Sequence, residues 1–242
     1  MRRAAELSTN LAGIRRALKK LSNRQHAEVS QRFFKTAPGE YGAGDVFLGI
    51  RVPEIRKLAR QYEQLRVTPV RKLLRSTIHE ERLLALFILA RQFARASETE
   101  RKRIYEFYLR NTKFVNNWDL VDGSAEHIVG AYLADKSKAP LYRLARSQSM
   151  WERRIAIMST FHFIKRSRFA DTLRIAEMLL SDEKDLVHKA VGWMLREIGK
   201  RDLPSEEQFL QAHYAKMPRT MLRYAIERLP ARKRQAYLKG TI

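Results

Sequence analysis

The sequence predicts an all-α fold, and three observations support this prediction. Apolar residues recur at steps of three and four in almost every segment, no segment alternates with a period of two, and helix start signals divide the chain into short pieces. Helices of about 10 to 18 residues with short links pack as antiparallel pairs. Successive pairs recur about every 35 to 45 residues, which is typical of HEAT-like or armadillo-like repeats. A compact irregular bundle is the alternative.

The individual helices follow from apolar spacing and start signals. One helix begins at Val52–Pro53 and another surrounds Pro69, because proline is tolerated in the first turn. Apolar residues at helical steps from Glu80 to Arg95 predict a helix that is buried along one broad face. Four later helices begin at residues that cap or start helices, namely Ser97, Ser205, Pro218 and Pro230.

One segment, Thr36 to Ile50, interrupts this pattern and holds four of the ten glycines. It predicts a loop. The segment lacks the Lys-Ser/Thr ending of a phosphate-binding loop. Its backbone amides could contact a phosphate, but a plain connector between helices is the favoured interpretation.

The charge balance indicates a polyanionic partner. The chain has 48 Lys and Arg against 26 Asp and Glu, a net charge of +22 and an isoelectric point of about 10.6. Solubility alone needs a net charge of only about 2 to 8. Nucleic acid is therefore favoured over an anionic membrane. The longest strongly apolar run, Leu83 to Ala90, is far shorter than the roughly 20 residues of a membrane span.

Cysteine is absent, which excludes disulfides and thiol nucleophiles and agrees with a reducing compartment. The first 21 residues place basic residues inside the apolar pattern, unlike a signal peptide. We therefore expect a cytoplasmic protein that neither binds nor crosses a membrane. The six histidines show no metal-ligand spacing and no serine sits in a nucleophile elbow, so we expect neither a metal nor a cofactor.

The segment NNWDLVD, Asn116 to Asp122, places a carboxylate beside an indole. Asn116 or Asn117 suits an N-cap, and Asp119 complements the helix dipole, so a helix continuing through Tyr132 is expected to begin here. Trp118 and Asp122, four positions apart, then share one face. Asp119 has a structural role, whereas Asp122 has no evident one.

A second tryptophan lies in a basic stripe. Lys189, Trp193, Arg196 and Lys200 share one helical face, and the opposite face supplies the packing residues Val187, Val191, Met194 and Ile198. Trp193 either fills the core or faces a ligand, because aromatic residues between cations suit nucleic-acid surfaces.

Further cations extend this basic character. Arg153 and Arg154 are adjacent on a helix and cannot share a direction, so one of them should face the ligand together with Lys165. Arg219 and Arg223 are either phosphate contacts or solvated charges.

Three ordered motifs carry a resemblance to a known family: WDLVD at 118–122, WERRIAI at 151–157 and KAVGWMLRE at 189–197. Together with the segment 33–54, they make nearly the whole chain resemble the AlkD family of DNA alkylation repair glycosylases. The resemblance implies one domain over 1–242, a curved solenoid of HEAT-like helix pairs whose concave basic groove holds duplex DNA. It also implies a monomeric, bacterial, nucleoid-associated protein of base excision repair.

The resemblance also assigns roles to residues. Trp118 and Trp193 would contact the backbone around the damaged nucleotide, Asp122 would lie close to the anomeric carbon, and Arg154 would hold a phosphate. Phe33 stands where related members carry a tyrosine, so it could stack but could not donate a hydrogen bond. The residues expected to bind DNA are Arg154, Lys189, Arg196, Lys200, Phe33, Lys165, Arg219 and Arg223.

The implied activity is excision of N3- and N7-alkylated purines without base flipping. Such a purine is already cationic and leaves without a general acid, so the charge to be stabilised is on the sugar. A non-catalytic protein that binds distorted or branched DNA is the alternative. A protein-interaction scaffold is a third class, and it would require an exposed apolar groove.

Overall fold

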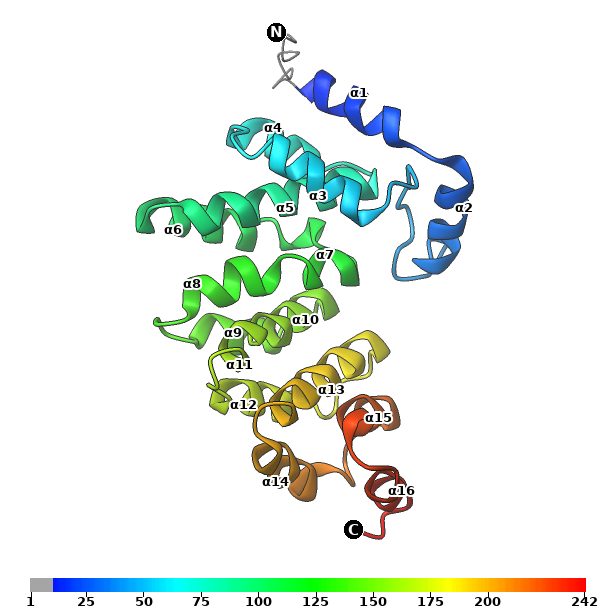
Figure 1. Ribbon diagram of the computed structural model, residues 1–242, viewed down its shortest axis with the longest axis vertical. Coiled ribbons are helices and arrows are strands. Elements are labelled where there is room, and N and C mark those ends of the chain that lie inside the picture. The colour runs from blue at the N-terminus through cyan, green and yellow to red at the C-terminus, as the bar shows by residue number, and fades with distance from the viewer. Residues whose placement is uncertain (1–10) are drawn as a thin grey trace, which may run out of the picture. The chain divides into compact units, whose positions relative to one another are not determined.

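The computed structural model describes residues 11–242 and is all-α, as predicted (Figure 1). Apart from a single bridge between Val46 and Ile78, no strand pairing occurs in this range. None of the helices in the described range has the length and apolar character needed to cross a bilayer. The part of the expected N-terminal pattern before Leu11 lies outside the described residues.

The chain divides into two compact units, one ending at Ser124 and the other beginning at Ala125. One domain over 1–242, arranged as a curved solenoid, stays a prediction. Unit 1 contains α1 (Leu11–Leu21), α2 (Arg24–Phe33), α3 (Val52–Gln61), α4 (Val67–Leu74), α5 (His79–Arg95), α6 (Glu98–Leu109), the 3-10 turn η1 (Thr112–Phe114) and α7 (Trp118–Asp122).

Unit 2 begins with one turn of π-helix. Its elements are η2 (Glu126–Gly130), α8 (Ala131–Leu133), α9 (Ala139–Ala145), α10 (Met150–Ser159), α11 (Phe161–Ile164), α12 (Ala170–Met178), α13 (Asp185–Gly199), α14 (Leu203–His213), α15 (Arg219–Ala225), the 3-10 turn η3 (Ile226–Arg228) and α16 (Ala231–Lys239).

Helix α5 forms the centre of unit 1, and α3, α4, α6 and α7 pack on it. Every residue of 79–89 is buried, so this half of α5 is covered on all sides rather than along one face. The buried set includes four consecutive polar residues, 79–82. Buried charges require partners, which come here from α1, from α7 and from the loops around α5.

Helix α13 forms the centre of unit 2 and packs against α10, α14 and α15. The predicted packing residues Val187, Val191, Met194 and Ile198 are all fully buried. Gly192 lets α15 approach closely, because a Cβ there would lie 2.3 Å from the carbonyl oxygen of Met221. The predicted division of α13 into an apolar and a basic face is therefore confirmed on its apolar side.

Most predicted helix starts are confirmed, with one correction. Ser97 caps α6 in a reciprocal capping box with Glu100, and Pro218 and Pro230 precede α15 and α16. Ser205 is not the N-cap of α14. Asp202 caps that helix, because its carboxylate accepts from both the backbone N–H and the hydroxyl of Ser205.

Candidate functional site

Helix α7 carries Trp118 and Asp122 on a single short turn. Asn117 caps it, since its side-chain oxygen accepts from the backbone N–H of Trp118 at 2.8 Å. The helix ends at Asp122 rather than continuing to Tyr132 as predicted. Its C-cap, Gly123, lies against the ring of Phe87 of α5, where a Cβ would come within 2.9 Å. The turn after Asp122 therefore packs closely on α5.

Both candidate residues on α7 are half-buried. Asp122 is therefore neither sealed in the core nor fully solvated. The pKa of the buried Tyr108 hydroxyl is raised mainly by burial, and the charge of Asp122 adds to that rise. A carboxylate in this position can face a ligand while part of its surroundings has a low dielectric constant.

Trp118 belongs to a stack of aromatic rings. Its indole lies parallel to Phe34 with centroids 5.1 Å apart, Phe34 stacks on Phe47 at 4.9 Å, and Phe47 stacks on His79 at 4.5 Å. The ring centroid of Phe33 lies 5.9 Å from that of Trp118 in a T-shaped arrangement, and Phe33 is 64% exposed. Phe33 and Trp118 thus form an accessible aromatic pair at the end of the stack, next to α7.

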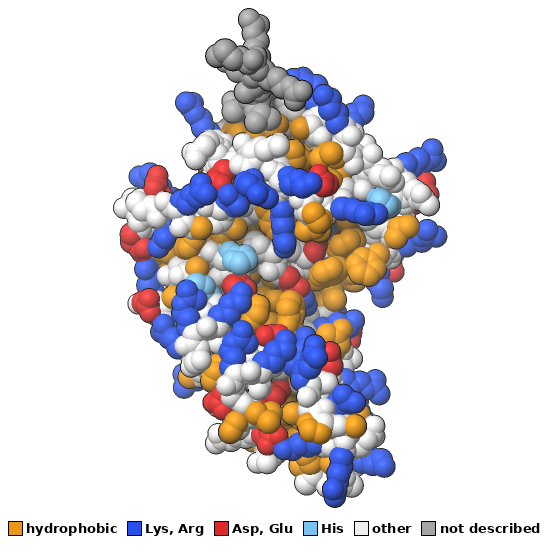
Figure 2. Space-filling model, in the orientation of Figure 1, with side chains coloured by type: hydrophobic (Ala, Val, Ile, Leu, Met, Phe, Trp, Pro, Cys, Tyr) orange, Lys and Arg blue, Asp and Glu red, His pale blue; other side chains and the backbone are white. Residues whose placement is uncertain are grey.

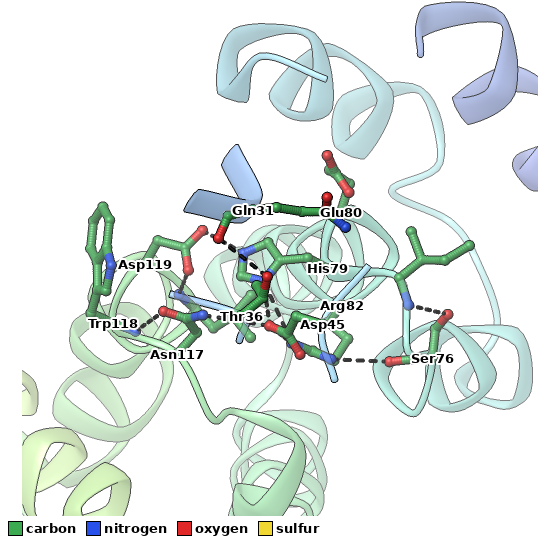
Figure 3. Close-up of polar contacts among 12 residues, drawn as sticks. Gln31, Thr36, Asp45, Ser76, His79, Glu80, Arg82, Asn117, Trp118 and Asp119 are labelled. Carbon is green, nitrogen blue, oxygen red and sulfur yellow. Dashed lines mark hydrogen bonds and ion pairs between the residues drawn. The ribbon is translucent and has the colours of Figure 1, made fainter. Parts of the chain in front are cut away.

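A buried ionic cluster lies beneath α7, and sequence reasoning missed it (Figure 3). Nε2 of His79 is 2.7 Å from Oδ2 of Asp119, and its Nδ1 is 3.1 Å from Oδ2 of Asp45. Arg82 donates to the same Asp45 oxygen at 2.6 Å. Asp119 also accepts from the backbone N–H of Leu120, which is the helix-start role predicted for it.

The cluster changes the acidity of two of its members. Burial lowers the pKa of His79, but the hydrogen bonds to Asp119 and Asp45 outweigh burial and raise that pKa above its ordinary value. Burial raises the pKa of Asp45, yet its bonds to His79 and Arg82 hold that pKa below the ordinary value. The charged forms of both residues are therefore favoured.

The glycine-rich segment 36–50 is a connector, as favoured, and its amides bind a carboxylate of the same chain. The backbone N–H groups of Leu48, Gly49 and Ile50 donate to Glu80 at 2.9, 2.8 and 3.3 Å. Gly49 has a φ of +74°, and a Cβ there would lie 2.2 Å from the carbonyl oxygen of Asn23. Glu80 thus occupies the position that the alternative interpretation gave to a phosphate.

Replacing Glu80 with glutamine is expected to destabilise the fold by about 2 to 3 kcal/mol, because charge-assisted bonds to three amides are lost and the new NH₂ group faces donors. Urea unfolding measures the change. The matched control is Glu28→Gln, which removes the exposed Arg24 pair and should cost less than about 0.5 kcal/mol. Equal effects of the two variants would contradict a stabilising role for the Glu80 bonds.

In unit 2, the predicted basic stripe of α13 is paired with acidic residues. Lys189 bonds Asp185 at 2.7 Å, Arg196 pairs with Glu227, and Lys200 bonds Glu197 at 2.5 Å. The half-buried indole of Trp193 also donates to Glu197, at 3.2 Å. The stripe therefore attracts phosphate less strongly than its sequence indicates, and a bound phosphate would compete with these carboxylates.

The adjacent arginines of α10 have different partners. Arg153 forms a two-bond ion pair with Asp182 at 2.5 and 3.2 Å and also donates to two backbone carbonyl groups. Arg154 is only 5% exposed and donates to the carbonyl oxygen of Leu186. The phosphate contact assigned to Arg154 stays a prediction.

The remaining candidate cations lie elsewhere in unit 2. Lys165 pairs with Glu126 and lies 4.2 Å from the ring centroid of Phe161. Arg219 is exposed and donates to the carbonyl oxygen of Leu238, and Arg223 is exposed. Lys and Arg side chains lie over much of the face drawn in Figure 2, consistent with the net charge.

The structure thus brings together Trp118, Asp122 and Phe33 in unit 1, and Trp193, Lys189, Arg196 and Lys200 in unit 2. Sequence reasoning missed His79, Asp45, Arg82 and Glu80. One signal was available, the polar run HEER at the start of an otherwise apolar helix. Within residues 11–242, no three His, Asp or Glu side chains gather in a way that would hold a metal ion.

Comparison with known proteins adds independent findings. A family model described as DNA alkylation repair enzyme matches residues 14–229. No curated protein matches the chain. Two solved structures share the fold. A predicted DNA alkylation repair enzyme from Enterococcus faecalis has a TM-score of 0.66 and 17% identity, with 87% of this chain and 97% of that chain covered.

The second is smu.31 from Streptococcus mutans UA159, with a TM-score of 0.51, 19% identity, and coverage of 89% of this chain and 95% of that chain. At these identities the two structures support the fold alone. The family model covers most of the chain and includes α7, α10 and α13. The chain therefore belongs to the DNA alkylation repair enzyme family.

Proposed function

We propose that the protein is a DNA glycosylase that hydrolyses the N-glycosidic bond of cationic N3- and N7-alkylated purines in duplex DNA, without flipping the base. The observation that carries the proposal is Asp122, a half-buried carboxylate one helical turn from Trp118, in a strongly basic chain of this family. The cap by Asn117 and the Asp119–His79 bond hold the turn that presents both side chains.

The chemistry follows from where charge develops. As the cationic purine leaves, it carries away the bonding electron pair and becomes neutral, while the sugar becomes an oxocarbenium-like cation. A carboxylate about 4 Å away, at an effective dielectric constant near 20, stabilises a unit charge by about 4 kcal/mol. Asp122 supplies that charge and also orients the water that adds to the anomeric carbon.

The other candidate residues bind the substrate. The faces of Trp118 and Trp193 add cation-π attraction of about 0.5 to 2 kcal/mol each. Phe33, beside Trp118, stacks on the nucleic acid without donating a hydrogen bond. The proposed phosphate contacts come from Arg154, Lys165, Lys189, Arg196, Lys200, Arg219 and Arg223.

The first test is base release by the wild-type protein from duplex DNA that contains 7-methylguanine. We expect release well above the spontaneous rate. We also expect affinity for duplex DNA to fall steeply between 50 and 200 mM salt, by about a thousandfold if six phosphates are contacted. Tight binding without release would favour the alternative, a non-catalytic protein for distorted or branched DNA. Absence of both would refute any direct action on DNA.

A further inference from the structure

The two nitrogens of the His79 ring both face carboxylate oxygens. Nε2 lies 2.7 Å from Asp119 on α7, and Nδ1 lies 3.1 Å from Asp45 in the glycine-rich loop. An ionised carboxylate only accepts hydrogen bonds, and a neutral imidazole donates from only one nitrogen. Both contacts are satisfied together when the ring carries two protons, as an imidazolium.

The charges around the ring balance only in that state. The charged groups facing His79 are Asp45, Asp119 and, from its own helix, Arg82, whose Nη2 is 3.5 Å from Nδ1. Phe34, the residue that follows α2, contributes an uncharged ring at 5.0 Å. With His79 protonated, two cations meet two anions. Loss of the proton leaves one uncompensated negative charge in a cluster whose histidine side chain is 2% exposed.

The imidazolium connects the core to the turn that carries the candidate catalytic pair. Asp119 lies between Trp118 and Asp122 on α7, so its bond to His79 ties that turn to α5. The stack from Trp118 through Phe34 and Phe47 ends on the same imidazole ring. One ionic contact, drawn in Figure 3, and one aromatic stack therefore relate the orientation of α7 to this ring.

We propose that His79, as an imidazolium held between Asp45 and Asp119, is a positioning residue that fixes the turn bearing Trp118 and Asp122 in its working orientation. The role in catalysis rests on the proposed glycosylase function. Asp45 lies in the glycine-rich loop, so the loop takes part in positioning α7 through the carboxylate of Asp45. Deprotonation of His79 breaks its bond to Asp119, so α7 is held less firmly. The rate of base release by the wild-type protein therefore falls as the pH rises.

The charge state of His79 is tested without any activity assay. In wild-type protein with nitrogen-15-labelled histidine, we expect both ring nitrogens of His79 to be protonated at pH 7.5, assigned by comparison with His79→Gln. His162 is an internal contrast, because burial lowers its pKa to about 4 and it should be neutral at that pH. A neutral imidazole at His79 in the folded protein would overturn the proposal.

The link to α7 is tested in wild-type protein whose tryptophans are also labelled with nitrogen-15. On raising the pH, the indole N–H signal of Trp118 should shift with the titration of His79, whereas that of Trp193, in unit 2, should not. An unmoved Trp118 signal while His79 loses its proton would show that the ring does not set the orientation of α7.

The effect on catalysis is measured by single-turnover release of 7-methylguanine from pH 6 to 9, with spontaneous release subtracted. His79→Gln should be about tenfold to a hundredfold slower than wild type at pH 7, with DNA affinity within about twofold, and should lack the alkaline decline. Adding Asp119→Asn to His79→Gln removes the uncompensated charge and should restore the rate about fivefold. A full rate in His79→Gln, or no gain in the double variant, would refute the positioning role.

These outcomes separate the two proposals. Wild-type protein that releases no base refutes the glycosylase function, while the histidine and indole signals still decide whether His79 positions α7. If His79→Gln does not fold, the His79 signals are assigned through bonds from its own backbone, and the wild-type protein decides alone. Its rate must then decline over the pH range in which the His79 and Trp118 signals change, and a rate that stays level through that range would contradict the proposal.

Discussion

Replacing Asp122 with asparagine is expected to slow release of 7-methylguanine from duplex DNA by about three powers of ten, while affinity for duplex DNA stays within a few fold. Asparagine keeps the size of the side chain but removes the charge, and about 4 kcal/mol of stabilisation of the cationic sugar corresponds to roughly a thousandfold in rate. Single-turnover release with protein in excess measures this loss directly.

The matched control is Asp135→Asn. Asp135 is 87% exposed and pairs with Arg168, so this variant makes the same change in net charge on a side chain of unit 2 that is not part of α7. It should release base at close to the wild-type rate. Full release by Asp122→Asn would remove Asp122 from the mechanism, and an equal loss in both variants would assign the effect to net charge.

Asp119, on the same turn, has a structural role. Both oxygens of Asp119 are engaged, one by the backbone N–H of Leu120 and the other by His79. Asp119→Asn would therefore disturb the position of α7, whereas Asp122→Asn changes the charge at the end of the turn. A comparison of the two variants by DNA affinity and by the indole signal of Trp118 separates position from charge.

Local signals predicted the helices well because each depends on residues close in sequence. Apolar spacing located the packing face of α13, and Ser97 with Glu100 caps α6 through bonds that span three residues. The wrong prediction of Ser205 as N-cap is also local. The true N-cap, Asp202, lies only three residues earlier and has the stronger acceptor.

The buried charges of unit 1 could not be predicted in this way. The partners of His79 are Asp45 and Asp119, 34 and 40 residues away, and the partners of Glu80 lie 30 to 32 residues away. Periodicity shows which face of a helix is apolar, but it does not show which distant loop neutralises a buried acid. Polar residues at an expected core position therefore indicate that a partner exists, but they do not show which residue it is.

The sequence predicted those parts of the candidate site that lie within one helix, but not the partners that come from other elements. Trp118 and Asp122 are one turn apart on the same short helix, so their common face follows from the helix alone. The basic stripe of α13 was also predicted as a face, but Glu227, the partner of Arg196, comes from a different element, 31 residues away. How strongly each cation attracts DNA therefore depends on acids that the stripe does not contain.

Replacing Glu206 with glutamine is expected to remove a large pH dependence of stability in unit 2. Glu206 is 3% exposed, and its Oε1 is a buried oxygen without a hydrogen-bond partner. Its carboxyl group lies against Gly199 of α13, where a Cβ would come within 1.7 Å of Oε2. Burial, together with the neighbouring Glu207 carboxylate, raises the pKa of Glu206 from 4.5 to about 8, and Arg196 opposes part of this rise.

The sign of the effect follows from proton linkage. The folded state binds this proton more tightly than the unfolded state, so the contribution of Glu206 is fully present below about pH 4.5 and is lost as the pH rises towards 8. The total loss is on the order of 3 to 5 kcal/mol. Glutamine stays neutral, so the variant should be more stable than wild type by a few kcal/mol at pH 8.5, and the two stabilities should converge near pH 5.

Urea unfolding of both proteins at half-unit steps from pH 5 to 9 measures this difference. His79 also favours the folded state less as the pH rises, but it is unchanged in Glu206→Gln, so the difference between the two curves isolates Glu206. Glu207→Gln provides the second comparison, because removing the neighbouring charge lowers the folded-state pKa of Glu206, so the loss of stability should be smaller and should end at a lower pH. Parallel curves for wild type and Glu206→Gln would mean that Glu206 is ionised in the folded protein at neutral pH, with a cation or water compensating its charge.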